Sequence, residues 1–134
     1  MATYLVTGGA GFVGGALVRR LVRAGARVTV LDDLFTGRAE VVPPAAELIV
    51  GSVEDESLVR ELVSHVSVVF HLAAAVGVKL IVEKPVYTIE TNVHGTEVVL
   101  KHANKKRKKV VMPNQSSALA APRQPRDQVL ACLA

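Results

Sequence analysis

The stretch that decides the fold is a glycine-rich turn, Thr7-Gly8-Gly9-Ala10-Gly11-Phe12-Val13-Gly14. A short apolar run over residues 3–7 leads into it, and residues 12–24 continue from it with apolar side chains at helical spacing. Because strand, turn and helix follow one another, backbone N–H groups and the positive end of the helix can approach a pyrophosphate. The turn therefore predicts dinucleotide binding at Gly8, Gly11 and Gly14, with a tight turn that binds nothing as the alternative.

The segment after the turn completes a β-α-β unit. Residues 27–31 form a β-branched run that ends at Asp32 and Asp33. Asp32 follows Gly11 at close to the spacing of about 20 residues at which an acid accepts hydrogen bonds from the adenosine ribose. Its charge would repel a 2′-phosphate, which favours NAD over NADP, whereas Arg38 nearby argues the other way. In the alternative interpretation, the two aspartates only cap the following loop.

The rest of the chain alternates strands and helices. We expect strands over residues 47–50, 67–71 and 109–112 and helices over residues 54–63 and 86–104, the last with Val98, Val99 and Leu100 in the core. The alternation predicts an α/β fold of the Rossmann type, a doubly wound parallel sheet that is incomplete, with about four to five strands. Pro113 cannot continue a central strand, since it lacks the N–H donor. We expect one domain over residues 1–112 and an irregular, disordered tail over residues 113–134.

Composition narrows the class of protein. Of the 134 residues 50% are hydrophobic, but no apolar run approaches the roughly 20 residues that span a bilayer, and no basic leader precedes the first strand. The single Cys132 excludes an internal disulfide, so we expect a soluble protein of the reducing cytoplasm. A membrane is therefore not an expected partner. Nor is a metal, because the histidines have no recognised ligand spacing.

Much of the net charge of +4 comes from one basic run, residues 105–109. At the end of a predicted helix, these side chains complement the helix dipole and remain in solvent. Charges elsewhere nearly cancel, and aromatic residues make up only 4% of the chain, which leaves few stacking platforms for bases. Nucleic acid is therefore not the expected partner, although the basic run keeps it open as an alternative.

Three later segments agree with the glycine turn. They are Leu31-Asp32-Asp33-Leu34-Phe35-Thr36-Gly37, Val69-Phe70-His71-Leu72-Ala73-Ala74, and Lys84-Pro85 followed by Thr91-Asn92-Val93-His94-Gly95-Thr96. With the Thr-Gly-x-x-Gly-x-x-Gly spacing of the turn, they resemble the extended short-chain dehydrogenases of the NAD-dependent epimerase/dehydratase group, whose members include nucleotide-sugar epimerases, dehydratases and decarboxylases. The resemblance covers residues 3 to about 112 and implies a Rossmann domain that holds NAD.

The resemblance also implies roles for individual residues. Phe12 and Val13 would meet the pyrophosphate, and Asn92 the bound cofactor. The ribose side would be formed by Asp32, Asp33, Thr36 and Gly37, the base side by Ser52 and Val53, and the nicotinamide side by Leu72, Ala73, Ala74 and the residues up to Val76. Ser52 departs from the family, which usually has Asp there to meet the adenine amino group, because a hydroxyl is a weaker and neutral acceptor.

Catalysis in this family needs a Tyr and, four residues later, a Lys on the same helical face. The Lys keeps the phenol acidic enough to exchange a proton while hydride moves to NAD. The chain has no such pair, since Thr91 follows Tyr87 at that distance and Tyr4 lies in the first strand. Ser116 or Ser117 stands where a catalytic serine would end the fifth strand, but the residues before it depart from the family. We therefore expect no catalytic residue in this chain.

Two classes of function remain open. The first is the NAD-binding portion of a nucleotide-sugar epimerase/dehydratase-type oxidoreductase, inactive alone because the sugar-binding part is missing, so that only full-length relatives would bind a nucleotide sugar. The second is a non-catalytic NAD-binding or interaction module left by truncation or frameshift, since the residues after 112 look unrelated to the family. In either class an incomplete sheet exposes a strand edge and apolar helix faces, so we expect self-association or a homo-oligomer.

Overall fold

The computed structural model describes residues 2–74 and 82–113. Along the chain the elements are β1 Thr3–Thr7, α1 Phe12–Arg23, β2 Arg27–Asp32, η1 Ala39–Val41, β3 Glu47–Val50, α2 Glu56–Ser64, β4 Val68–His71, α4 Pro85–Lys105 and β5 Lys109–Val111. The strands form one parallel sheet in the order β3-β2-β1-β4-β5. The predicted α/β class and the partial Rossmann-type sheet are confirmed. Strand order reverses between β1 and β4, which is the switch point where open α/β sheets bind ligands.

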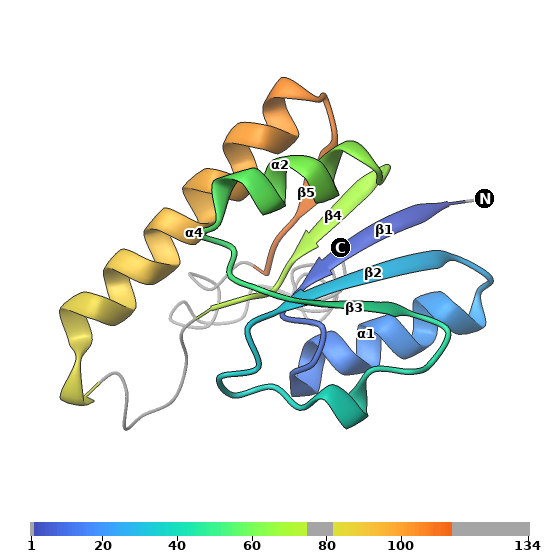
Figure 1. Ribbon diagram of the computed structural model, residues 1–134, viewed down its shortest axis with the longest axis horizontal. Coiled ribbons are helices and arrows are strands. Elements are labelled where there is room, and N and C mark those ends of the chain that lie inside the picture. Colours follow the sequence, from blue (N-terminus) through green and yellow to red (C-terminus); the bar gives the residue numbers. More distant parts are fainter. Residues whose placement is uncertain (1, 75–81, 114–134) are drawn as a thin grey trace, which may run out of the picture.

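The core consists of two apolar clusters on opposite faces of this sheet. Successive residues of a strand point to opposite faces, so Leu5 and Val69 pack with Val99 of α4 on one face. Val6 packs with Val18 of α1 on the other face. Figure 1 shows the same division, with α1 on one side of the sheet and α2 and α4 on the other. Each face is therefore covered, as parallel strands require.

The helix ends follow from local side-chain chemistry. The helix predicted from residue 54 begins at Glu56, because the Asp55 carboxylate accepts a hydrogen bond from the backbone N of Leu58 at 3.3 Å and caps α2. Pro85 occupies the first turn of α4, where a missing N–H costs nothing. Gly25 ends α1 with a φ of +84°, a conformation that other residues rarely adopt.

The packing of α4 corrects one prediction. Val98 and Val99 are buried as expected, but Leu100 is 42% exposed and does not belong to the core. The helix instead meets the sheet and α2 through a face that includes the buried residues Thr88 and His102 and the small residue Gly95. Four exposed apolar residues, hereafter the outer face of α4, line another side of the helix: Val86, Ile89, Val93 and Leu100.

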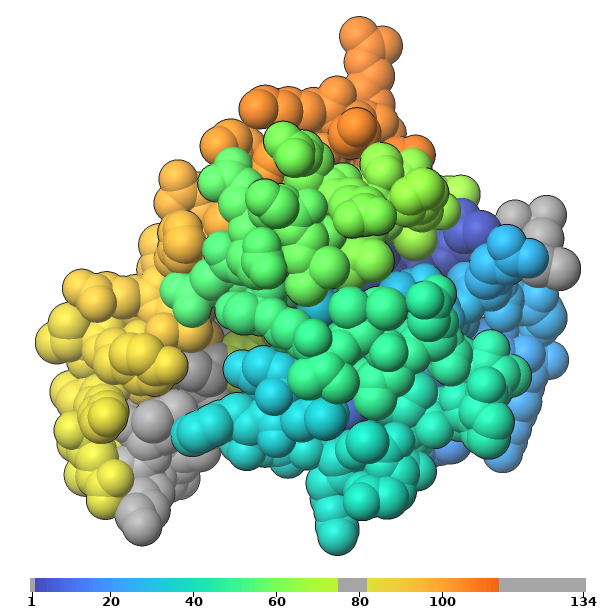
Figure 2. All heavy atoms as spheres, viewed as in Figure 1, coloured from blue at the N-terminus to red at the C-terminus, as the bar shows by residue number. Residues whose placement is uncertain are grey.

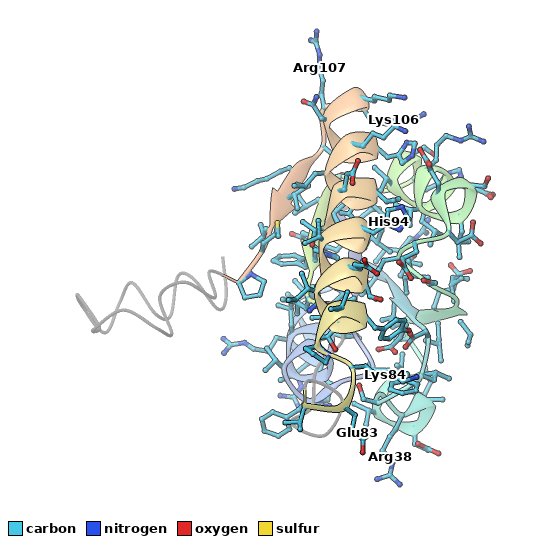
Figure 3. The ribbon with its side chains drawn as sticks, turned by 90° about the vertical axis from the view of Figure 1, so that its left-hand side faces the viewer. Arg38, Glu83, Lys84, His94, Lys106 and Arg107 are labelled. Atoms are coloured by element: carbon cyan, nitrogen blue, oxygen red, sulfur yellow. The ribbon has the colours of Figure 1, made fainter. Side chains whose placement is uncertain are left out.

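The basic run lies where the sequence predicted it, at the carboxyl end of α4. Lys105 is in the last turn and Lys106 caps the helix. Figure 3 shows Lys106 and Arg107 at the end of α4 opposite Lys84. In the described ranges, no helix is long and apolar enough to cross a membrane. The predictions for Val76, Ser116, Ser117 and residues 114–134 fall outside the described residues.

Candidate dinucleotide-binding site

The glycine turn connects β1 to α1 through backbone contacts that leave no room for side chains. Gly8 has a φ of +74°, and its N–H donates to the Leu31 carbonyl at 2.8 Å, which ties the turn to the end of β2. A Cβ on Gly8 would lie 2.8 Å from the Ala73 backbone N, and one on Gly14 would collide with the Gly8 carbonyl. The turn is therefore held closely against the residues that follow β4.

Gly11 differs from these two glycines. A Cβ there would meet only the Gly8 carbonyl oxygen, at 3.4 Å, which is ordinary van der Waals contact. Gly11 is also the N-cap of α1 and provides no side-chain hydrogen bond to the first N–H groups of the helix. The helix start thus retains donors for an anion, and the free space above Gly11 is available for a ligand to approach the backbone.

A cavity of about 460 Å³ opens over the carboxyl ends of β1, β2, β3 and β4. Figure 2 shows the loop after β2 and the first turns of α4, which both contribute to its wall, at the same end of the molecule. All the predicted site residues except Gly37 line the cavity. Seven further residues line the cavity, some of them within the segments that carry the resemblance: Leu31, Phe35, Gly51, Glu54, Tyr87, Thr91 and Gly95. Its size lies within the range of about 300–1,000 Å³ that is usual for small-molecule and cofactor sites.

Asp32 is buried at the end of β2, with only 8% of its surface exposed. Its Oδ2 accepts a hydrogen bond from the backbone N of Ala10 at 3.0 Å, and its Oδ1 accepts one from Leu34 N at 2.8 Å. Gly37 lies outside the cavity wall but allows this packing, because a Cβ there would be 2.9 Å from the carboxylate. Asp32 therefore does hold the loop, as one interpretation of the sequence had it. Each oxygen keeps a further lone pair for a ligand.

Arg38 does not lie in the cavity wall. Its side chain is 80% exposed, with Nε 3.9 Å from Oε2 of Glu40. Figure 3 shows it extending outward from the body of the molecule. Arg38, the nearby cation that would favour NADP, therefore extends into solvent and is not part of the cavity wall.

The loop after β3 forms another wall. The Gly51 N–H donates to the Asp32 carbonyl at 3.1 Å, and the Ser52 Oγ accepts from Glu54 N at 3.0 Å. Glu54 is held from α4 by Nδ1 of His94 at 3.1 Å. Three hydrogen bonds therefore fix this loop to β2, to itself and to α4.

His71 forms the most buried polar contact of the site. Its Nδ1 lies 2.8 Å from Oγ1 of Thr7, and its Nε2 lies 3.1 Å from Oγ1 of Thr96. The same Thr7 oxygen accepts hydrogen bonds from the N–H groups of Leu72 and Ala73, each at 3.1 Å. Burial lowers the pKa of His71 from 6.5 to about 4, so the ring is neutral at pH 7. No site role was predicted for His71, although a polar residue ending a buried strand beside Thr7 was a usable signal.

The two tyrosines lie in different parts of the fold. Tyr4 packs against Phe70, with ring centroids 5.5 Å apart, and so belongs to the sheet. Tyr87 lines the cavity at the start of α4, and the cation nearest its ring is Lys84, at 5.9 Å from the centroid. Within the described ranges, no group of three or more His, Cys, Asp or Glu side chains is placed to hold a metal ion.

The glycine turn at the switch point and the buried acid at the end of β2 define a class of protein, the Rossmann-type dinucleotide-binding domains. Over residues 4–132 the chain matches the NAD dependent epimerase/dehydratase family, and it belongs to that family. The match extends past residue 112, where the resemblance was expected to end. NAD, the cofactor predicted from Asp32, is the cofactor that the family's description gives.

Individual relatives show how much of a family member the chain represents. It is 42% identical over 115 residues to the UDP-N-acetyl-alpha-D-glucosaminuronate decarboxylase of Bacillus cytotoxicus, covering 84% of this chain and 36% of the relative. It is 37% identical over 116 residues to the UDP-glucose 4-epimerase of Lactobacillus helveticus, covering 85% of this chain and 35% of the relative. The chain thus spans about a third of the length of these relatives.

Solved structures agree with these relatives. The UDP-glucose 4-epimerase of Thermotoga maritima, crystallised with UDP-glucose, matches 82% of this chain and 37% of its own at a TM-score of 0.78 and 35% identity. The Thermus thermophilus UDP-glucose 4-epimerase in complex with NAD matches 78% of this chain and 34% of its own, at a TM-score of 0.72 and 36% identity. The fold and the family are therefore established from both sequence and structure.

Proposed function

We propose that this chain binds NAD in the cavity above the strand ends, as the cofactor portion of a nucleotide-sugar epimerase/dehydratase-type oxidoreductase. The observation that carries the proposal is a single cavity that joins an uncapped helix start at Gly11 to a buried carboxylate at Asp32. A dinucleotide needs both, because its pyrophosphate seeks N–H donors and its ribose hydroxyls seek an acceptor.

In this proposal each wall would hold a part of NAD. The start of α1, with Gly11, Phe12, Val13 and Gly14, would hold the pyrophosphate. The ribose would lie against Asp32, Asp33 and Thr36, and the base against Ser52 and Val53. On the other side of the switch point, Leu72, Ala73 and Ala74 would face the nicotinamide, with Asn92 reaching the cofactor from α4. Bound there, the nicotinamide would accept and return a hydride during oxidation of a sugar hydroxyl.

Two features support NAD over NADP. Asp32 would place a carboxylate beside the 2′-phosphate of NADP, and like charges at close range repel. Arg38, which would have to neutralise that phosphate, extends into solvent near Glu40. The proposal therefore includes a preference for the unphosphorylated ribose.

Calorimetric titration with NAD and NADP tests this proposal. We expect NAD to bind and to stabilise the chain by roughly 2.7 kcal/mol at 100 times its dissociation constant. Asp32→Asn should weaken NAD binding and reduce the preference over NADP. The matched control is Asp55→Asn, since Asp55 also accepts a backbone hydrogen bond but caps α2 outside the cavity wall. Absence of any NAD binding or thermal shift would refute the cofactor assignment.

We further propose that the 134 residues alone do not turn over a nucleotide sugar, because no Tyr is followed four residues later by Lys. The alternative function, a non-catalytic NAD-binding or interaction module, makes the same prediction for this chain. Incubation with NAD and UDP-glucose or UDP-glucuronate, followed by chromatography of the sugar nucleotides for an epimerised or decarboxylated product, checks it, because a returned hydride leaves no net change in nicotinamide absorbance. Turnover by the pure chain would contradict the inactive assignment.

We also propose self-association through the outer face of α4, with a second copy as the partner. Val86, Val93 and Leu100 recur at seven-residue spacing with Ile89 between them, which is the pattern of a helix-pairing seam. Val93→Lys should shift the chain toward monomer in sedimentation velocity. Val50→Lys is the matched control, since Val50 is 61% exposed on β3. A monomeric wild type, or disruption by Val50→Lys alone, would overturn this proposal.

A further inference from the structure

The loop after β3 has a neutral hydroxyl, that of Ser52, in the cavity wall, and NAD binding alone does not explain it. In an open α/β sheet the adenosine half of a dinucleotide lies over the strands on one side of the switch point, so its base extends past the ribose acceptor of β2 toward β3. Gly51, Ser52, Val53 and Glu54 line the cavity there. Ser52 is the neutral hydroxyl in this wall, and its hydrogen bonds decide which edge of a base it can meet.

The hydrogen bonding of Ser52 leaves it able to act in both directions. Among residues 2–74 and 82–113, its Oγ accepts one hydrogen bond, from Glu54 N at 3.0 Å. A hydroxyl has one proton and two lone pairs, so Ser52 retains the proton to donate and one lone pair to accept. Adenine presents an amino donor at C6 and an acceptor at N1, whereas a 6-oxopurine presents an acceptor at C6 and a donor at N1. A hydroxyl that can both donate and accept a hydrogen bond complements the edge of either base.

The rest of the wall holds this hydroxyl in place. A Cβ on Gly95 would lie 2.6 Å from Cγ2 of Val53, so α4 packs directly on the loop and gives the base an apolar neighbour in Val53. Glu54 is the one acceptor-only side chain of the loop in the cavity wall. Its Oε1 is 3.1 Å from Nδ1 of His94. The bond to His94 ties the Glu54 carboxylate to α4, so in this arrangement Ser52 would be the polar group of the loop that meets a base edge.

We propose that Ser52 is the residue that sets base selectivity in this chain, and that it admits a 6-oxopurine as well as adenine. The dinucleotides bound would then include the NAD analogue whose base is hypoxanthine. This inference rests on the proposed NAD site, since it concerns the base end of the same cavity. A carboxylate at position 52 would have the opposite effect, because it accepts from an amino group but repels a carbonyl oxygen.

Calorimetric dissociation constants for NAD and for nicotinamide hypoxanthine dinucleotide test the inference. Because both would make neutral hydrogen bonds to Ser52, we expect the wild-type constants to agree within about fivefold. Ser52→Asp should favour NAD by about tenfold or more, through a charge-assisted bond to the amino group and repulsion of the carbonyl. Ser57→Asp is the matched control, since it adds the same charge on exposed α2 outside the cavity wall and should leave the ratio unchanged.

The outcomes separate the possible failures. If neither dinucleotide binds, the NAD site itself is wrong, and this inference falls with it. If the wild type binds NAD but discriminates against the hypoxanthine analogue by more than about fivefold, Ser52 does not admit a 6-oxopurine and the inference is overturned. Glu54→Gln then shows whether that selectivity comes from Glu54. Should Ser52→Asp fail to fold, the wild-type ratio and Ser52→Ala, which should weaken both ligands alike, still decide the question.

Discussion

The hydroxyl of Thr7 donates to Nδ1 of His71 across 2.8 Å, and this bond fixes the protonation state of the histidine. The Thr7 oxygen already accepts from the N–H groups of Leu72 and Ala73, so its own proton must point at the ring. Nδ1 is then an acceptor, and Nε2 carries the proton that it donates to Thr96. Protonation of Nδ1 would place a hydrogen against the Thr7 hydroxyl, where no lone pair remains.

We therefore predict that acid destabilises the fold through His71. Its folded pKa of about 4 lies below the ordinary 6.5, so the unfolded chain binds the proton first as the pH falls. The contribution of His71 is complete above about pH 6.5 and is lost progressively toward pH 4, an effect on the order of 3 kcal/mol. Denaturant unfolding at several pH values between 7 and 4 measures it.

His71→Asn keeps an acceptor for Thr7 but has no proton to gain, so its stability should change less than that of the wild type over this range. His65→Asn, at the exposed carboxyl end of α2, should follow the wild-type profile. Parallel profiles for the wild type and His71→Asn would show that the acid sensitivity originates elsewhere.

Two glycines of the turn should separate folding from binding. Gly14→Ala forces a Cβ into the Gly8 backbone, and we expect a loss of roughly 3 kcal/mol or more in the free energy of unfolding. Gly11→Ala meets only the Gly8 carbonyl oxygen, at 3.4 Å, so the ligand-free chain should melt like the wild type. Its methyl group nevertheless occupies the space above the helix start, and NAD should bind about tenfold more weakly.

Thermal melts and NAD titrations of the two variants check this division. If Gly11→Ala bound NAD as tightly as the wild type, the pyrophosphate would not lie over the start of α1. A stable Gly14→Ala would show that the turn has more freedom than its contacts indicate.

The ends of α1 and α4 offer a reciprocal test of backbone strain. Each helix ends in a residue with positive φ, Gly25 at +84° and Arg107 at +54°. The following residue donates back to the helix in both cases, Ala26 N to the Leu21 carbonyl at 3.1 Å and Lys108 N to that of Ala103 at 2.8 Å.

We expect Gly25→Ala to cost about 1 kcal/mol and Arg107→Gly to gain about the same, because only glycine adopts this conformation without a Cβ penalty. For a domain of this size, about 1 kcal/mol corresponds to a melting shift of roughly 4–8 °C. Arg107→Ala removes the charge but keeps the strain, so an equal gain from that variant would assign the effect to the charge instead.

A fourth prediction concerns the contact between α4 and the loop after β3. Gly95→Ala should destabilise the chain by about 1–3 kcal/mol, since its Cβ would lie 2.6 Å from Val53 Cγ2. Val53→Ala removes that methyl group and should cost about 1–2 kcal/mol by itself. In the double variant the clash disappears, so the combined cost should fall short of the sum by about 0.5 kcal/mol or more. Additive costs would mean that Gly95 and Val53 do not constrain one another.

The sequence predicted the helices and strands closely, because each depends on residues that are close to it in the chain. The apolar runs of the strands, the glycines of the turn and Asp55 before α2 all act on residues nearby in the chain. Most residues of the cavity wall were predictable too, since the carboxyl ends of parallel strands meet at one edge. The remainder depends on how α4 lies against the sheet. That placement exposes Leu100 and buries His102, and it brings Tyr87, Thr91 and Gly95 into the cavity wall. Helical periodicity alone cannot decide any of these placements.

The polar Ser52 and the apolar residues of the two clusters have different roles, and this has a consequence for descent. Residues such as Val6, Val30 and Val99 fill the two faces of the sheet, whereas Ser52 lies in the cavity wall at the strand ends. A lineage can therefore exchange the residue at position 52 while the apolar residues that hold the sheet together stay the same. Preference for a particular base can drift between closely related sequences while the architecture stays constant.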